Sequence, residues 1–187
     1  MLIHLIRHTT PDIESGVCYG QKNLDTLNSF EQEKNSIIAR LKPQYDIVYS
    51  SPLKRCTQLA KTIKTREFAV DNDLMEVNFG NWEGKTWDEI PHSESKPWMD
   101  DFINVCPPNG ESLTQMQQRV QRFIEHHLKP NEQKNTAIVT HAGVIRLFFV
   151  WALNIPLENI FKIKLDYGVV IEMDYQSTEF GASVRFL

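Results

Sequence analysis

The chain of 187 residues is 41% hydrophobic and 24% charged, a balance typical of one globular domain. Its net charge of -4 and its sequence pI near 5.9 give no basic footprint for nucleic acid or an anionic membrane. Its 3 cysteines lack metal-binding spacing and favour a cytoplasmic location, and no apolar run approaches the ~20 residues of a membrane span.

The first predicted element is a buried strand over 2–6, which ends abruptly at Arg7 and His8. In open α/β sheets, ligands bind beyond the carboxyl ends of the strands. A nucleophilic histidine beside an arginine there suits an anionic substrate. Residues 9–20 are rich in Thr, Pro, Asp and Gly, so we expect a loop across the mouth of the site. This loop either supplies donors to an anion or serves as plain connection.

A weakly amphipathic helix is predicted over 29–41, followed by a second strand over 46–49. Ser51 as N-cap with Pro52 at N1 then predicts the start of the next helix. Arg55 falls in the first turn of that helix, where the macrodipole disfavours a cation unless an anion is close. We therefore favour an anion-binding Arg55 over a solvated one.

After a short strand over 67–70, residues 74–84 mix carboxylates, aromatics and glycines, which predicts an ordered loop. Residues 85–111 add two short helical pieces and a turn, without a linker that would divide the chain. We therefore expect a single domain, 1–187, in which 77–111 is an insertion covering the active site. Most large aromatics in this stretch should be core, and one or two could face a flat ligand ring. They are Trp82, Trp87, Trp98 and Phe102.

Ser112 begins a capping box that opens a long amphipathic helix, predicted over 113–129. A buried strand over 136–140 follows, and it again ends on a histidine, His141. Gly143 lets the backbone approach a bound phosphate closely at the start of the next helix. Three more strands are predicted, over 161–165, 169–175 and 183–186.

Strands that alternate with helices predict an α/β fold, a three-layer α/β/α sandwich with a mostly parallel central sheet. The carboxyl ends of parallel strands meet at one edge of such a sheet. Four residues at strand ends or just beyond them should therefore come together, although they are far apart in the sequence. These residues are Arg7, His8, Arg55 and His141.

This group of side chains suits phosphoryl transfer. Two arginines and His141, expected to be protonated, can bind the phosphoryl oxygens while His8 attacks phosphorus in line. A carboxylic acid must protonate the leaving oxygen and then activate water, and Glu76 is the first candidate. Because cationic side chains neutralise charge as Mg²⁺ does elsewhere, no metal or other cofactor is expected. His4 and His8, four residues apart on a strand, lie roughly 13 Å apart and cannot share a metal ion.

Five segments occur in the order in which they appear in a known family, at 5–8, 50–60, 74–84, 109–112 and 139–146. They include Leu-Ile-Arg-His, Ser-Ser-Pro-Leu-Lys-Arg, Asn-Gly-Glu-Ser and Thr-His-Ala-Gly. Through them the chain resembles the histidine phosphatase superfamily, in its phosphoglycerate mutase-like branch. The resemblance implies that His8 is the phosphorylated nucleophile and Glu76 the proton donor, with Glu83 as a rival. It implies as phosphate ligands Arg7, Arg55 and His141.

Many members of the family continue the Arg-His pair with Gly-Glu-Thr or Gly-Glu-Ser, whereas this chain has Thr-Thr-Pro-Asp at 9–12. This start, with Gly-Val-Cys-Tyr-Gly at 16–20, most resembles the alpha-ribazole phosphatases, which dephosphorylate α-ribazole 5′-phosphate in assembly of the cobalamin lower ligand. The expected partner is thus a small-molecule phosphomonoester. A mutase-like enzyme, or a broad phosphatase for sugar phosphates, nucleotides or phosphoproteins, stays open, as does a homodimer. A third hypothesis is a phosphate-binding protein without activity. The presence of His8 together with Glu76 argues against it, because binding alone needs neither a nucleophile nor an acid.

Overall fold

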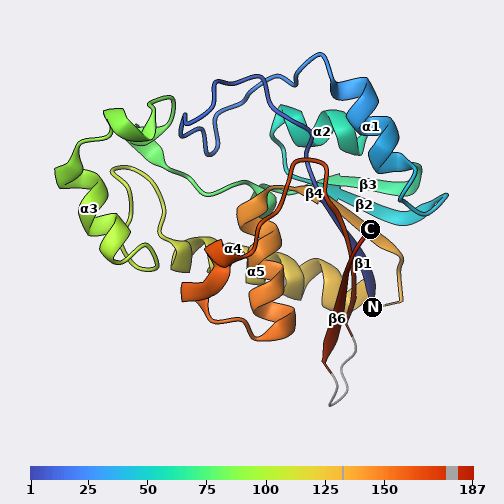
Figure 1. Ribbon diagram of the computed structural model, residues 1–187. Coiled ribbons are helices and arrows are strands. Elements are labelled where there is room, and N and C mark those ends of the chain that lie inside the picture. Colours follow the sequence, from blue (N-terminus) through green and yellow to red (C-terminus); the bar gives the residue numbers. More distant parts are fainter. Residues whose placement is uncertain (132, 176–180) are drawn as a thin grey trace.

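The computed structural model describes residues 1–131, 133–175 and 181–187 (Figure 1). Its centre is one six-stranded sheet in the order β3-β2-β4-β1-β5-β6. The strands are β1 (Leu2–Arg7), β2 (Tyr45–Ser50), β3 (Thr65–Val70), β4 (Thr136–Thr140), β5 (Val170–Tyr175) and β6 (Ala182–Phe186). Strands β1 to β4 pair in parallel, whereas β5 and β6 add antiparallel pairs. The predicted mostly parallel sheet is confirmed.

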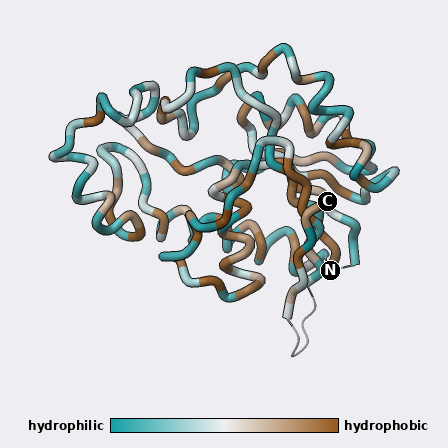
Figure 2. Tube along the Cα trace, viewed as in Figure 1, coloured by the Kyte–Doolittle hydropathy of each residue, from teal (hydrophilic) through white to brown (hydrophobic). Residues whose placement is uncertain are grey.

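Helices cover both faces of this sheet (Figure 1). The α-helices are α1 (Phe30–Ile38), α2 (Lys54–Ala60), α3 (His92–Asp100), α4 (Leu113–Phe123) and α5 (Ala142–Leu153). Helices α4 and α5 bury one apolar cluster against the sheet, and α1 and α2 bury a second cluster on the opposite face. Figure 2 shows hydrophobic residues concentrated along the central strands and α5. The predicted α/β/α layering is therefore confirmed.

Shorter helical turns connect these elements. The 3₁₀ helices span Asn72–Leu74, Gly80–Trp82, Trp87–Glu89, Lys129–Asn131 and Leu157–Lys162. Helix α4 opens with the predicted capping box of Ser112 and Gln115, and beyond Phe123 it continues as a π-helix over Ile124–Leu128. Among the described residues, no helix combines the length and hydrophobicity needed to cross a membrane.

The strands β1, β4 and β2 end side by side. Arg7 pairs with Thr140, and Ser50 pairs with Val139. Beyond the strands, the His8 amide donates to the Thr140 carbonyl at 3.0 Å. The residues that follow the three strands therefore emerge at one edge of the sheet. They are His8, His141 and Ser51.

Two local predictions are wrong. The expected strand over 161–165 is absent from the described structure, because Leu157–Lys162 form a 3₁₀ helix and the next carbonyls accept hydrogen bonds from arginine side chains. Ser51 is not the N-cap of α2, which begins at Lys54 with Leu53 in the N-cap position. The Ser51 hydroxyl accepts from the Leu53 amide at 3.4 Å and also bonds a histidine of the candidate site.

Candidate active site

His8 follows β1 directly, and its side chain is buried. Its Nδ1 lies 2.7 Å from the Thr9 carbonyl oxygen, which can only accept, so Nδ1 carries the ring proton. The other nitrogen, Nε2, accepts from Arg55 Nε at 3.2 Å. Burial and, next, the Arg55 charge hold the pKa of His8 well below its usual 6.5. His8 is therefore a neutral imidazole with its basic lone pair on Nε2.

Arg55, in the first turn of α2, is fully buried and held by the loop that follows β1. Its Nη1 donates to the Lys22 carbonyl and its Nη2 to the Gly20 carbonyl, both at 2.8 Å. The guanidinium also faces both histidines: its Nε contacts His8, and its Nη2 lies 3.3 Å from His141 Nδ1. The loop thus supplies acceptors that orient Arg55.

His141 follows β4 and occupies the N-cap position of α5. Its Nε2 lies 2.8 Å from the Ser51 hydroxyl, and its ring centroid lies 5.0 Å from that of His8. Burial, followed by His8 and Arg55, holds the pKa of His141 well below 6.5. The expectation of a protonated His141 is therefore wrong for the protein by itself. A bound anion would act in the opposite direction and raise its pKa.

Arg7 completes the cationic cluster. Its Nη1 donates to the Leu165 carbonyl, and its guanidinium carbon lies 3.9 Å from the centroid of the Tyr167 ring. Across the described residues, the buried Nε of Arg7 and the buried hydroxyl of Thr9 have no hydrogen-bond partner. Two buried polar groups next to His8 in the sequence fit a ligand rich in acceptors, as a phosphoryl group is.

Glu76 lies in the loop after the 3₁₀ helix Asn72–Leu74. Its Oε2 accepts from the Gly143 amide at 3.2 Å, and its Oε1 accepts from the Val77 amide at 2.9 Å. A Cβ atom at position 143 would overlap Glu76 Oε1, so only glycine leaves room for this carboxylate. The Gly143 amide is thus occupied by Glu76, and its part as a phosphate ligand stays a prediction.

Glu83, the rival carboxylate, has a different environment. Its Oε1 accepts from the Gln21 amide at 2.8 Å and from the Phe79 amide at 3.1 Å. Glu76 lines the pocket described below, whereas Glu83 does not. The geometry therefore favours Glu76 as the acid and gives Glu83 the task of tying two loops together.

A pocket of about 390 Å³ opens beside this cluster. Its charged lining residues are Arg7, Glu76, Glu111 and Arg146. Its wall is aromatic and comes largely from the segment 77–111, which was expected to cover the site. The wall residues are Phe79, Trp87, Trp98, Phe102 and Phe161.

Fewer of the large aromatics in this segment are core than expected, because Trp87, Trp98 and Phe102 all line the pocket. Trp82 is fully buried in a small core with Cys18 and Ile90. Trp87 and Trp98 line the pocket and stack with ring centroids 5.9 Å apart and planes 26° apart. A flat ring bound here would therefore meet indole surfaces.

The comparison with known families decides the class. Residues 3–185 match the histidine phosphatase superfamily (branch 1). The chain belongs to the histidine phosphatase superfamily. The predicted family and enzyme class are thereby confirmed.

Relatives of this histidine phosphatase carry several phosphatase names. The chain is 30% identical over 181 residues to a protein of Hydrogenobacter thermophilus provisionally named phosphoserine phosphatase 2. This match covers 91% of the chain and 88% of that protein. The chain is 28% identical to the adenosylcobalamin/alpha-ribazole phosphatase of Escherichia coli, covering 90% and 87%. The solved alpha-ribazole phosphatase of Shigella flexneri superposes with a TM-score of 0.84 at 25% identity, covering 100% and 96%.

Sequence patterns missed several residues of the site in this histidine phosphatase. The Tyr19 and Tyr167 hydroxyls lie 2.9 Å apart and join the loop that follows β1 to the segment before β5. Ser51, expected only as a cap, also contacts His141. Arg119 lies three residues after Met116 on α4, at the edge of its apolar stripe. A charged residue in that position is the signal that could have revealed it.

Proposed function

We propose that this histidine phosphatase hydrolyses phosphomonoesters through a phosphohistidine formed on His8. The observation that carries the proposal is the neutral imidazole, with its lone pair on Nε2 and Arg55 beside it. In the first step Nε2 bonds to phosphorus while the bond to the leaving oxygen breaks. Arg7, Arg55 and His141 hold the remaining phosphoryl oxygens in this proposal.

Glu76 is proposed to serve both steps. As a carboxylic acid it donates its proton to the leaving oxygen, which becomes an alcohol. As a carboxylate it then takes a proton from water, whose oxygen bonds to phosphorus while the phosphorus–nitrogen bond to His8 breaks. The products are inorganic phosphate and free enzyme, with the proton returned to Glu76. Arginines carry the charge neutralisation, so we propose a metal-independent reaction.

The proposed substrate is α-ribazole 5′-phosphate, which carries a benzimidazole ring on its ribose phosphate. Three observations support it: the stacked Trp87 and Trp98 in the pocket wall, the start of the chain at 9–20, and the alpha-ribazole phosphatases among its relatives. With the phosphate beside Arg7, the apolar ring would lie against this aromatic wall.

Phosphoserine is the second candidate, because a relative at 30% identity carries that name. Phosphoserine has no ring for the aromatic wall, and its ammonium group needs a carboxylate partner. The pocket-lining carboxylates among the described residues are Glu76 and Glu111. Glu111 is already paired with Arg119, and Glu76 is assigned to the chemistry. The pocket therefore favours the ring-bearing substrate.

The test is kcat/KM, with EDTA present, for α-ribazole 5′-phosphate, ribose 5-phosphate, phosphoserine, 3-phosphoglycerate and p-nitrophenyl phosphate. A preference of about 100-fold for α-ribazole 5′-phosphate, about 2.7 kcal/mol of differential transition-state binding, would support the assignment. A preference for phosphoserine would replace the substrate and keep the chemistry. A flat profile would indicate a general phosphatase, and loss of activity in EDTA would contradict metal independence.

A further inference from the structure

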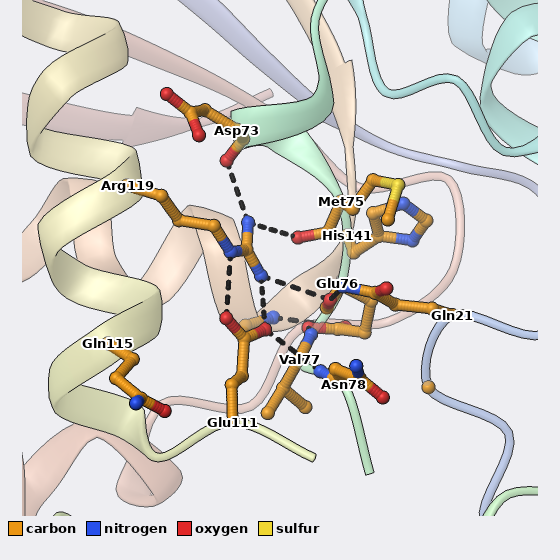
Figure 3. Close-up of polar contacts among 12 residues, drawn as sticks. Gln21, Asp73, Met75, Glu76, Val77, Asn78, Glu111, Gln115, Arg119 and His141 are labelled. Carbon is orange, nitrogen blue, oxygen red and sulfur yellow. Dashed lines mark hydrogen bonds and ion pairs between the residues drawn. The ribbon is translucent and has the colours of Figure 1, made fainter. Parts of the chain in front are cut away.

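A buried arginine on α4 is bonded to the backbone that carries Glu76 (Figure 3). Arg119 Nη1 donates to the carbonyl oxygens of Asp73 and Met75, both at 2.7 Å. Its Nη2 donates to the carbonyl oxygen of Glu76 itself at 3.0 Å. One guanidinium therefore fixes the path of the main chain up to and including the proposed acid.

Glu111 holds this arginine in place and adds a contact of its own. Its Oε2 accepts from Arg119 Nε at 3.0 Å, and its Oε1 accepts from Arg119 Nη2 at 2.6 Å. The same Oε1 accepts from the Asn78 amide at 2.9 Å. The pair therefore grips the chain on both sides of Glu76, at Met75 before it and at Asn78 after it.

The segment needs such a device because it belongs to no strand or α-helix after Leu74. Its carbonyls are turned toward Arg119 rather than toward a neighbouring strand (Figure 3). A lysine could not replace the arginine, because a single ammonium cannot span the three carbonyls and the carboxylate that the planar fork reaches. The Gln21 side chain also donates to the Glu76 carbonyl, at 2.9 Å, which links the loop that follows β1 to the same carbonyl.

We propose that Arg119, clamped by Glu111, is the positioning residue for the acid Glu76. The inference rests on the proposed function and adds the group that holds the acid beside the Gly143 amide. Proton transfer depends steeply on placement, whereas attack on a good leaving group needs little protonation. Loosening Arg119 should therefore impair reactions that need the proton far more than those that do not.

The experiment compares a phosphate ester of an alkyl alcohol with p-nitrophenyl phosphate in Arg119→Lys. We expect kcat for the alkyl ester to fall about tenfold more than kcat for p-nitrophenyl phosphate, with KM little changed. Arg122→Ala is the matched control, because the exposed Arg122 lies on the same helix and bonds the same segment through the side chain of Asp73 at 2.9 Å, not through its backbone. This control should leave both substrates unchanged.

A double variant separates positioning from general stabilisation. Once Glu76→Gln has removed the acid, adding Arg119→Lys should cause no further selective loss on the alkyl ester. A further selective loss, or equal losses on both substrates in Arg119→Lys alone, would overturn the proposal. If Arg119→Lys does not fold, Glu111→Gln supplies the same comparison. If Glu76→Gln itself loses both substrates equally, Glu76 is not the acid and the proposed function fails at that point; if Glu76→Gln is selective and Arg119→Lys is not, only the role of Arg119 fails.

Discussion

Arg55 donates from Nε to His8 Nε2 across 3.2 Å, which places a permanent cation against the lone pair of the proposed nucleophile. The contact opposes protonation of His8, and it also occupies the lone pair that must attack. A phosphoryl oxygen that accepts from Arg55 would release this lone pair. Binding of the anion and unmasking of the nucleophile are therefore the same event in the proposed mechanism.

Replacing the nucleophile should abolish turnover. His8→Ala is expected to lower kcat by a factor on the order of 10⁴ or more, since it removes the atom that bonds to phosphorus. Wild-type enzyme quenched during turnover of ³²P-labelled substrate should carry an acid-labile, base-stable phosphoenzyme. His126→Ala, at an exposed histidine, is the control and should behave as wild type. Normal turnover by His8→Ala would rule out the phosphohistidine.

The planar guanidinium of Arg55, with its several donors, should be as important for activity as its positive charge. Arg55→Lys is expected to lower kcat/KM by about 10² to 10³, because an ammonium cannot reach Gly20, Lys22 and His8 together. Arg40→Lys is the control: Arg40 also donates to three carbonyls, those of Ser36, Gly168 and Leu187. A similar loss in both variants would indicate a structural effect.

The pH dependence of kcat/KM should reveal the depressed pKa of His8. Activity needs the neutral imidazole, and burial together with Arg55 lowers its pKa well below 6.5. The acidic limb of the profile should therefore lie well below pH 6.5, and Arg55→Gln should move it upward in the residual activity. An acidic limb at or above 6.5 in the wild type would contradict this environment for His8.

The buried histidines should also make folding sensitive to acid. The pKa values of His4, His8 and His141 are all lowered by burial. Below pH 6.5 the unfolded chain binds protons that the folded chain does not, so the free energy of unfolding should fall as pH falls. Each histidine adds at most about 1.4 kcal/mol per pH unit. Denaturant titrations of wild type and His141→Asn should show a shallower slope in the variant, and identical slopes would contradict a neutral His141.

The aromatic wall should matter only for substrates with a ring. Trp87→Ala is expected to lower kcat/KM for α-ribazole 5′-phosphate about tenfold, through lost stacking in the pocket. Ribose 5-phosphate, which lacks the base, should react at the wild-type rate. Equal losses on the two substrates would show that Trp87 supports the fold of the wall rather than the ring.

Local sequence patterns predicted the sheet and the clustering of four polar side chains. The end of a strand can be located in the sequence because an apolar run gives way there to a polar residue. Arg7, His8 and His141 were found in this way, and Arg55 by its conflict with the dipole of α2. The error at 161–165 has a physical cause. Its backbone acceptors are taken by arginines far away in the sequence, and such bonds leave no periodic trace.

The positions that differ most from expectation are those whose side chains bond groups far away in the sequence. Ser51 was predicted to cap a helix, and its hydroxyl does accept from the Leu53 amide, but it also bonds the side chain of His141. The pattern predicts Arg119 as one of the polar residues of an amphipathic helix, yet the carbonyls that it bonds lie more than forty positions earlier, at Asp73, Met75 and Glu76. These contacts are set by packing between elements and become visible only in three dimensions.

The indole rings of Trp82, Trp87 and Trp98 lie within 6.4 Å of one another, centroid to centroid. Chromophores this close share electronic excitation, so their near-ultraviolet circular dichroism should be that of a coupled trio rather than of three separate indoles. Because one ring belongs to a buried core and two line the pocket, the coupled signal reports both on the integrity of the segment 77–111 and on occupancy of the pocket. The protein thus carries an internal optical probe of its own ligand site, without a label.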